Sequence, residues 1–348
     1  MTQPIASADP ILAIRDLKKH YGGKKHWSGA VSKAIRAVDG VTFTIYEGET
    51  FGIVGESGCG KTTLGRCIAR AHDPSGGEIL YTPEGEKPVD LAKLSQRQLK
   101  PYRQDVQMIF QDPISSLNPR MTLLDIIGEP MVVNGLARGK EVARRVGELL
   151  ERVGLRAEYM VRYPHAFSGG QRQRIGIARA LALNPRVIVC DEPVSALDVS
   201  VQAQILNLLQ DLQAEKKLTY LFIAHDLGVV EYLCDRVAVM YVGQVVELAE
   251  TSDLFARPLH PYTEALMSAV PPANPRAPSK PRLLEGDLAN AANLPPGCHF
   301  HPRCGYCVER CRTEEPELRE YSPGRFVRCH RAEELKLDGV AELVEASA

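Results

Sequence analysis

Over much of this chain, unbroken runs of apolar residues alternate with segments in which apolar residues recur at helical spacing. Such unbroken runs are typical of strands that lie buried on both faces of a parallel sheet. The chain has four of them, at 51–54, 106–110, 187–190 and 218–224. Further strands are predicted at 11–17, 37–45 and 78–81, and a hairpin at 237–240 and 244–248 with its turn at Gly243. Strands and helices in alternation predict an α/β fold.

Helical spacing dominates residues 115–167. Five apolar residues fall on one face of a helix there, namely Val142, Val146, Leu149, Leu150 and Val153. A second apolar helix face consists of Val201, Ile205, Leu208, Leu209 and Leu212. Shorter helices are predicted at 172–183 and 262–270. The long helical stretch predicts a helical subdomain, at about 115–170, inserted into the α/β core.

The first buried run leads into a glycine-rich segment. Its residues match G-x-x-x-x-G-K-[ST] in full: Gly55, Glu56, Ser57, Gly58, Cys59, Gly60, Lys61 and Thr62. Leu64, Ile68 and Ala71 follow at helical spacing, so the motif lies between a strand and a helix, the context in which it binds phosphate. Glycines let backbone N–H groups surround a triphosphate, and the helix start adds partial positive charge. We expect Lys61 to reach the β- and γ-phosphates and the Thr62 hydroxyl to ligate Mg²⁺.

The charges balance, with Lys+Arg 42 against Asp+Glu 43 in 348 residues, so nothing in the total points to nucleic acid or to an anionic membrane. No apolar run of about 18 residues or more is present to span a membrane. The first ten residues lack the basic and apolar regions of a signal peptide. The expected location is therefore the cytoplasm, with any membrane span supplied by a partner.

Two further polar groups narrow the chemistry. Asp191 and Glu192 follow the buried run at 187–190, at a strand end where ligands bind in open α/β sheets. Asp191 would hold Mg²⁺ through water, and Glu192 would polarise the attacking water. A second anion site is predicted where small residues open a helix, at Ser168, Gly169, Gly170 and Gln171. Because one nucleotide needs one phosphate cradle, the second cradle indicates binding to the nucleotide of another subunit.

These motifs occur in the order and context of the ATP-binding cassette ATPases, which residues 11–250 resemble. Gln111, the segment 195–198 and His225 complete the resemblance. It implies a P-loop NTPase core that binds ATP and Mg²⁺, with an antiparallel β subdomain and the inserted helical subdomain.

The resemblance also implies roles for single residues. Gln111 would contact Mg²⁺ and sense a membrane subunit, Asp198 would be the D-loop aspartate, and His225 would contact the γ-phosphate. Tyr21 falls where the family's aromatic residue stacks on adenine, and Thr63 belongs to the same nucleotide-binding set. Glu192 would be the catalytic base, assisted by Lys61, Gln111 and His225.

Longer stretches resemble one branch of the family, the ATP-binding subunits of bacterial oligopeptide and dipeptide importers. They are 46–66, 108–120, 255–271 and the cysteine-bearing tail. The implied activity is ATP hydrolysis that drives uptake of di- and oligopeptides. The implied partners are a homologous ATPase in a heterodimer, two integral membrane permeases and, indirectly, a substrate-binding protein, with no nucleic acid. The implied location is peripheral, at the cytoplasmic face of the inner membrane.

Two alternatives to peptide import stay open at this point. The same family contains importers of nickel, glutathione and some sugars. A soluble ABC-type ATPase of DNA repair or translation is the alternative from another class, and such proteins carry long coiled-coil insertions or two cassettes in one chain. Neither feature occurs in this sequence.

The expected organisation is a cassette domain at 1–255 and a C-terminal extension at 256–348, within which a proline-rich linker at 271–281 precedes the cysteine-rich tail. A polar insert at 22–32 is predicted to form a solvated hairpin.

Five of the nine cysteines crowd into the extension: Cys298, Cys304, Cys307, Cys311 and Cys329. Soft ligands on a loop-rich segment suit either Zn²⁺ or an iron–sulfur cluster, and their spacing does not decide between them. The resemblance to peptide importers implies a [4Fe–4S] cluster on Cys298, Cys304, Cys311 and Cys329, with Cys307 outside it. Unligated thiols, or a regulatory redox role, remain alternatives.

Overall fold

The computed structural model describes residues 9–23, 33–112, 115–269, 286 and 288–340. The chain divides into two compact units. Unit 1 comprises residues 46–49 and 94–223, with the N-terminal nine residues; unit 2 comprises 10–45, 50–93 and everything after 223. The predicted linker at 271–281 and residues 24–32 of the polar insert lie outside the described residues.

Unit 1 contains a parallel sheet of three strands, β6 (Val106–Ile109), β7 (Val187–Asp191) and β8 (Thr219–Ile223). β7 lies between the other two and pairs in parallel with both. Its first four residues are apolar and fully buried, which confirms the prediction made from the unbroken apolar run. The helices of this unit are α2 (Tyr102–Asp105), α3 (Leu123–Val133), α4 (Lys140–Arg152), α5 (Gly169–Leu181) and α6 (Val199–Lys216), with 3-10 turns η3 (Ala157–Val161) and η4 (Pro164–Ala166).

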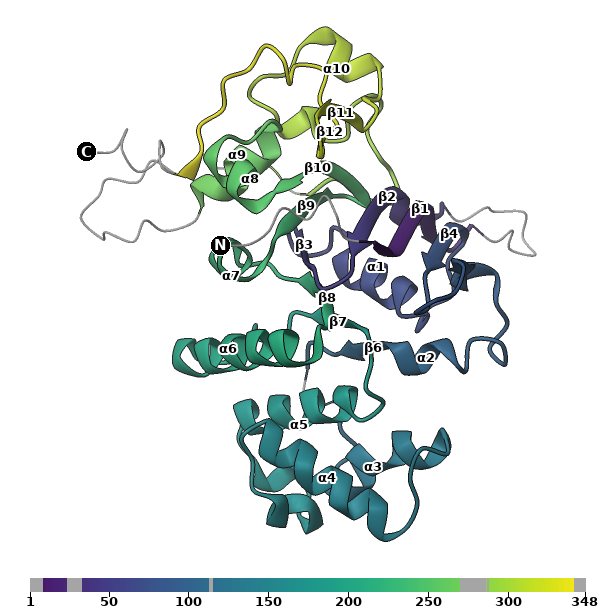
Figure 1. Cartoon of the computed structure of the whole chain (residues 1–348). Helices are drawn as coiled ribbons and strands as arrows, with labels where there is room; N and C mark the ends of the chain where they lie inside the picture. The colour runs from purple at the N-terminus through teal and green to yellow at the C-terminus, as the bar shows by residue number, and fades with distance from the viewer. Residues whose placement is uncertain (1–8, 24–32, 113–114, 270–285, 287, 341–348) are drawn as a thin grey trace. The chain divides into compact units, whose positions relative to one another are not determined.

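The helices α3, α4 and α5 pack on one another (Figure 1). The apolar face predicted for α4 is buried through Val142, Val146, Leu149 and Leu150. On α6 the buried face includes Leu206 in place of the predicted Leu208. α5 begins three residues before the predicted start at 172, because Ser168 caps it.

Unit 2 contains two sheets. Four strands form the first in the order β2 (Ile35–Tyr46), β1 (Pro10–Tyr21), β4 (Gly76–Tyr81) and β5 (Val89–Asp90). Strands β1 and β4 pair with each other in antiparallel orientation. In the second sheet, β3 (Thr50–Val54) runs parallel to β9 (Arg236–Tyr241), and β10 (Gln244–Glu250), β12 (Arg325–Val327) and β11 (Arg319–Ser322) continue it antiparallel. The helices are α1 (Lys61–Ile68), α7 (Leu227–Leu233), α8 (Thr251–Ala256), α9 (Pro261–Ser268) and α10 (Glu309–Thr313), with 3-10 turns η2 (Leu91–Lys93) and η5 (His301–Arg303).

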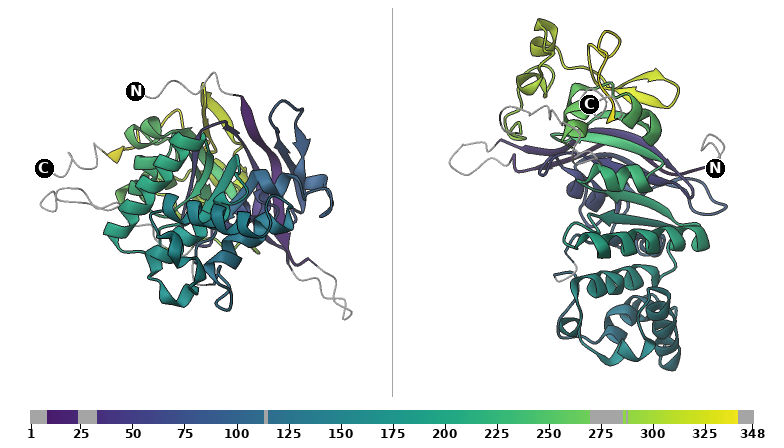
Figure 2. Two further views of the ribbon diagram at one scale, coloured as in Figure 1. Left: turned by 60° about the horizontal axis from the view of Figure 1, so that its bottom comes forward. Right: turned by 90° about the vertical axis from the view of Figure 1, so that its left-hand side faces the viewer.

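The C-terminal segment is part of unit 2, and it lies beside α8 and α9 (Figure 2). Strand β12 pairs with β10, and Val327 is buried together with Leu259 and Ala332. Glu247, in β10, accepts hydrogen bonds from the backbone N–H groups of Leu259 and His260, at 2.7 and 2.9 Å. The sequence pattern did not predict these tail strands, because each contains only three or four residues.

None of the helices in the described part of the chain is both long enough and apolar enough to cross a membrane.

Candidate functional site

The glycine-rich segment forms a loop between β3 and α1, as the sequence predicts. At Gly55, where φ is 150°, a Cβ atom would lie 2.2 Å from the carbonyl oxygen of Met240. At Gly60, where φ is 110°, a Cβ atom would lie 2.0 Å from the carbonyl oxygen of Ala37. Only glycine fits at these two positions, because both the backbone conformation and the close approach exclude a side chain.

Two side chains of the loop, those of Lys61 and Cys59, are buried. The Lys61 ammonium group donates hydrogen bonds to the carbonyl oxygens of Gly55 and Glu56, at 2.7 and 3.0 Å. The Cys59 thiol is buried, and this burial raises its pKa. Lys61 is therefore already curled toward the space that the loop encloses.

Two more predicted site residues belong to unit 2. His225 is exposed, and the preceding residue, Ala224, donates its N–H to the carbonyl oxygen of Ile53 at 3.1 Å. That bond places His225 next to the end of β3, from which the phosphate loop starts. Tyr21 ends β1 with 37% of its surface exposed, and the Lys19 ammonium group lies 4.9 Å from its ring centroid. The ring is thus partly exposed, with Lys19 over it and His72 in edge-to-face contact.

Unit 1 brings the predicted carboxylate pair and the predicted glutamine together. Asp191 ends β7 and is fully buried, whereas Glu192, the next residue, has a positive φ of 45°. The Gln111 side chain donates a hydrogen bond to the Glu192 carboxylate at 2.8 Å. The residue expected to sense a membrane partner thus contacts the residue expected to activate water.

The predicted second anion site is the start of α5. Ser168 is its N-cap: the Ser168 hydroxyl accepts from the Gln171 N–H at 3.3 Å, and the Gln171 side chain accepts from the Ser168 N–H at 3.0 Å. Ser168 and Gly169 are exposed. This capping box presents the helix start to the surface of unit 1.

The segment with Asp198 packs against that helix start. A Cβ atom at Gly170 would lie 2.4 Å from Cγ1 of Val201, so the two helices α5 and α6 meet without room for a side chain. Asp198 caps α6 by accepting from the Val201 N–H at 3.0 Å, and the Ser200 hydroxyl, which donates to it at 2.7 Å, lowers its pKa. The residues Ser168–Gln171, called the signature motif from here on, and the segment with Asp198 therefore form one packed group.

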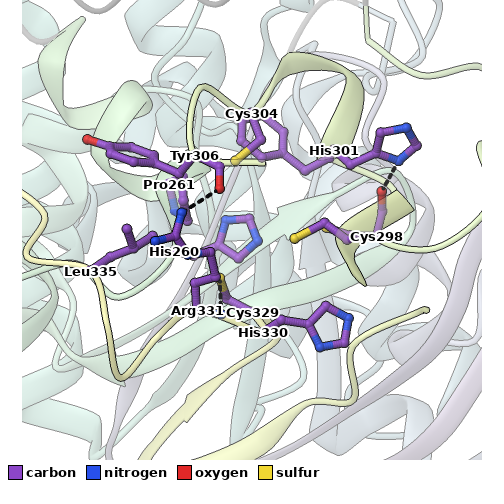
Figure 3. Close-up of a pocket in the computed structure, with 12 residues that line it drawn as sticks. His260, Pro261, Cys298, His301, Cys304, Tyr306, Cys329, His330, Arg331 and Leu335 are labelled. Atoms are coloured by element: carbon purple, nitrogen blue, oxygen red, sulfur yellow. Dashed lines mark hydrogen bonds between the residues drawn. The ribbon is translucent and has the colours of Figure 1, made fainter. Parts of the chain in front are cut away.

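The four cysteines predicted as cluster ligands line a single pocket in the C-terminal segment. Figure 3 shows the sulfur atoms of Cys298 and Cys304 directed toward the same space. Burial raises the pKa of Cys298 to about 12 and the pKa values of Cys304 and Cys329 to about 11. Cys307 does not line the pocket.

Nowhere in the described residues do three or more His, Cys, Asp or Glu side chains form a group that could hold a metal ion. The four thiols share a pocket, but they are not gathered into a ligand shell. The [4Fe–4S] prediction therefore has no direct support from the geometry.

Sequence reasoning missed two residues that contact the phosphate loop. The Arg303 guanidinium group binds the Glu56 carboxylate, and the Tyr262 hydroxyl accepts a hydrogen bond from the Glu56 N–H. They lie 247 and 206 positions away along the chain. The resemblance had marked the segment with Tyr262, but it gave no role to either residue.

Comparisons with known proteins agree with this arrangement of motifs. Residues 38–195 match the model of the ABC transporter family, and residues 246–311 match that of the oligopeptide/dipeptide transporter C-terminal region. The chain is 51% identical to the putative oligopeptide transport ATP-binding protein YkfD of Bacillus subtilis, with 92% of this chain and 95% of that protein covered. It is 50% identical to the oligopeptide transport ATP-binding protein AppF of the same organism, with 93% and 98% covered.

A solved structure shares the fold. The dimeric, post-hydrolysis ATP-binding cassette MJ0796 bound to ADP and Pi aligns with a TM-score of 0.60 at 30% identity, over 69% of this chain and 98% of that one.

Proposed function

Because the chain belongs to the ATP-binding cassette ATPases with an oligopeptide/dipeptide transporter C-terminal region, we propose that it is the ATP-hydrolysing subunit of a peptide importer. The observation that carries this proposal is the joint presence of the phosphate loop, the Gln111–Glu192 contact and the capped signature helix in one chain.

Each motif has a chemical role in this proposal. The phosphate loop and Lys61 bind the ATP phosphates, Tyr21 stacks on adenine, and Thr62 with Asp191 holds Mg²⁺. Glu192 polarises the attacking water, while His225 contacts the γ-phosphate. Gln111 reports the state of a membrane partner to Glu192, to which it already donates a hydrogen bond.

The signature motif completes the site of a second ATPase subunit. Ser168 and Gly169 are exposed at a helix start, where a γ-phosphate of a facing subunit would find N–H groups and a partial positive charge. ATP binding would thereby close a head-to-tail dimer, and hydrolysis would reopen it. The partner in this arrangement is a homologous ATPase, as in a heterodimer.

The membrane partners would dock on the helical subdomain. Its first helix, α3, ends in exposed apolar side chains, Val132 at 50% and Val133 at 61% exposure, followed by Leu136 at 39%. Exposed apolar residues in sequence are typical of a surface that another protein covers. The resemblance to peptide importers supports a location at the cytoplasmic face of the inner membrane, where two permease subunits would hold the chain.

The test is purification of the tagged chain from its native membranes. Two integral membrane proteins and a second ATPase are expected to co-purify, and peptide with its binding protein should stimulate ATP hydrolysis in vesicles. Stimulation by nickel, glutathione or a sugar, with none by peptides, would replace the substrate while keeping the importer. A chain that purifies with no membrane protein would favour the soluble ABC-type ATPase.

We further propose that Cys298, Cys304, Cys311 and Cys329 ligate one [4Fe–4S] cluster. The fit rests on the pocket that all four line and that Cys307 does not. Thiolate ligands are what such a cluster requires, and ligation would add folding energy to the loop-rich tail. The cluster would lie outside the hydrolysis machinery.

Iron content tests this assignment. Protein purified without oxygen is expected to be brown with about four irons per chain, the number set by the cluster type. Cys307→Ser should keep the iron and Cys304→Ser should lose it. Colourless protein with one zinc would change the metal, and metal-free protein with a folded tail would reject both.

A further inference from the structure

The side chain of Glu56, the second residue of the phosphate loop, is bound by an arginine of the C-terminal extension. Arg303 donates from both terminal nitrogens, at 2.7 and 3.0 Å, to the two carboxylate oxygens of Glu56. The Arg303 side chain is only 8% exposed and that of Glu56 is 28% exposed. Two parallel, charge-assisted hydrogen bonds in a largely buried place fix both position and direction.

The backbone of Glu56 is held by a second residue from beyond the nucleotide-binding motifs. The Glu56 N–H donates to the hydroxyl oxygen of Tyr262, 2.8 Å away, and Tyr262 is fully buried. This N–H is therefore already paired with a side chain from outside the loop. The loop is thus tied to the extension at both its main chain and its side chain.

Arg303 is itself on a rigid support. It is the last residue of η5. The residue directly before this turn is Phe300, whose ring is buried. Phe300 packs against Tyr241 and Tyr262, with ring centroids 5.2 and 5.4 Å apart. The aromatic cluster anchors the start of η5, the turn that carries Arg303.

The charge of Arg303 matters as much as its position. Glu56 places a carboxylate in a loop whose ligand is a polyanion, and an unpaired carboxylate there would repel the triphosphate. Arg303 neutralises it.

We propose that Arg303 is a positioning residue of the ATP site, through which the C-terminal extension sets the shape and charge of the phosphate loop. This inference rests on the proposed function, since it presumes that the loop binds ATP. It assigns to the extension a direct part in nucleotide affinity, beyond any role of its cysteines.

The experiment measures the Kd of the full chain for a fluorescent ATP analogue. Arg303→Gln should raise Kd about tenfold, the usual scale for losing a hydrogen-bonded partner of a charged group. The double variant E56Q/R303Q also removes the carboxylate that Arg303→Gln leaves unpaired. Its Kd should return to within about threefold of the wild-type value, because no unpaired charge remains in the loop. The matched control is Arg310→Gln, which removes the surface ion pair with Glu314 in the same extension and should leave Kd unchanged.

Three results separate the outcomes. If Arg303→Gln binds the analogue as tightly as the wild type, the inference is wrong. If E56Q/R303Q binds as weakly as Arg303→Gln alone, Arg303 only stabilises the tail, and the inference again fails. If the wild type binds no better than Lys61→Ala, the proposed ATP site itself is wrong, and that failure is distinct from the other two.

Discussion

The two helices that begin at glycine motifs, α1 in unit 2 and α5 in unit 1, have opposite kinds of N-terminus. The N-cap of α1 is Gly60, and among the described residues no side chain caps this helix. The N-cap of α5 is Ser168, and it exchanges hydrogen bonds with Gln171 in a capping box.

This difference suits two different roles. The start of α1 would bind ATP within one chain, whereas the start of α5 would bind the nucleotide of a partner. The first N–H groups of a helix need acceptors, and the absence of a capping side chain at α1 in the described residues suits a helix start that binds phosphate. In α5 the Ser168 hydroxyl accepts from one of them, the Gln171 N–H, and this cap stabilises the exposed helix start without a ligand. We therefore expect one chain to bind ATP by itself, and expect hydrolysis to need the signature helix of a partner.

The largest expected effect separates binding from chemistry. Glu192→Gln should lower ATP turnover of the assembled complex about 10³-fold while ATP affinity stays within about twofold, because the base lies outside the phosphate loop. Steady-state hydrolysis and equilibrium binding of ATP measure the two quantities. Glu231→Gln, an exposed change of the same kind on α7, is the control and should alter neither. Undiminished hydrolysis would sink the role assigned to Glu192.

The next effect concerns the isolated chain. Purified alone and dilute, it should bind ATP but hydrolyse it about 100-fold more slowly than the assembled complex, since the facing signature helix is missing. The measurement is the rate per chain as a function of protein concentration. A rate per chain that is independent of concentration and equal to that of the complex would show that α5 is dispensable.

The sequence predicts the two helix starts better than it predicts what surrounds them. A strand, a glycine loop and a helix follow one another along the chain, and the four residues from Ser168 to Gln171 contain both partners of the capping box. The order of neighbouring residues is therefore enough to predict these two helix starts. The Arg303–Glu56 pair joins residues 247 positions apart, and strand β12 is three residues long. Contacts of this kind leave no period in the sequence, so only the folded chain shows them.

A smaller effect tests the tight packing behind the signature helix. Gly170→Ala should lower the free energy of unfolding by about 1–3 kcal/mol, because its Cβ would lie 2.4 Å from Cγ1 of Val201. Urea denaturation followed by circular dichroism measures this loss, and the double variant G170A/V201A should recover part of it. The control is Gly176→Ala in the same helix, where no atom lies within 4 Å of the added Cβ. That change should stabilise the helix by about 0.5–1 kcal/mol.

The smallest effect on stability concerns the cap itself. Ser168→Ala removes the acceptor of the Gln171 N–H and should cost about 1 kcal/mol of unfolding free energy. Thr122→Ala is its matched control, because Thr122 caps α3 through a capping box of the same kind with Asp125. Both variants should shift the urea midpoint of the isolated chain by similar amounts. They should differ in the assembled complex, where Thr122→Ala keeps ATP turnover and Ser168→Ala loses most of it, since of these two helix starts only that of α5 is proposed to face a nucleotide. Equal turnover in the two variants would mean that the capping box of α5 serves the helix alone.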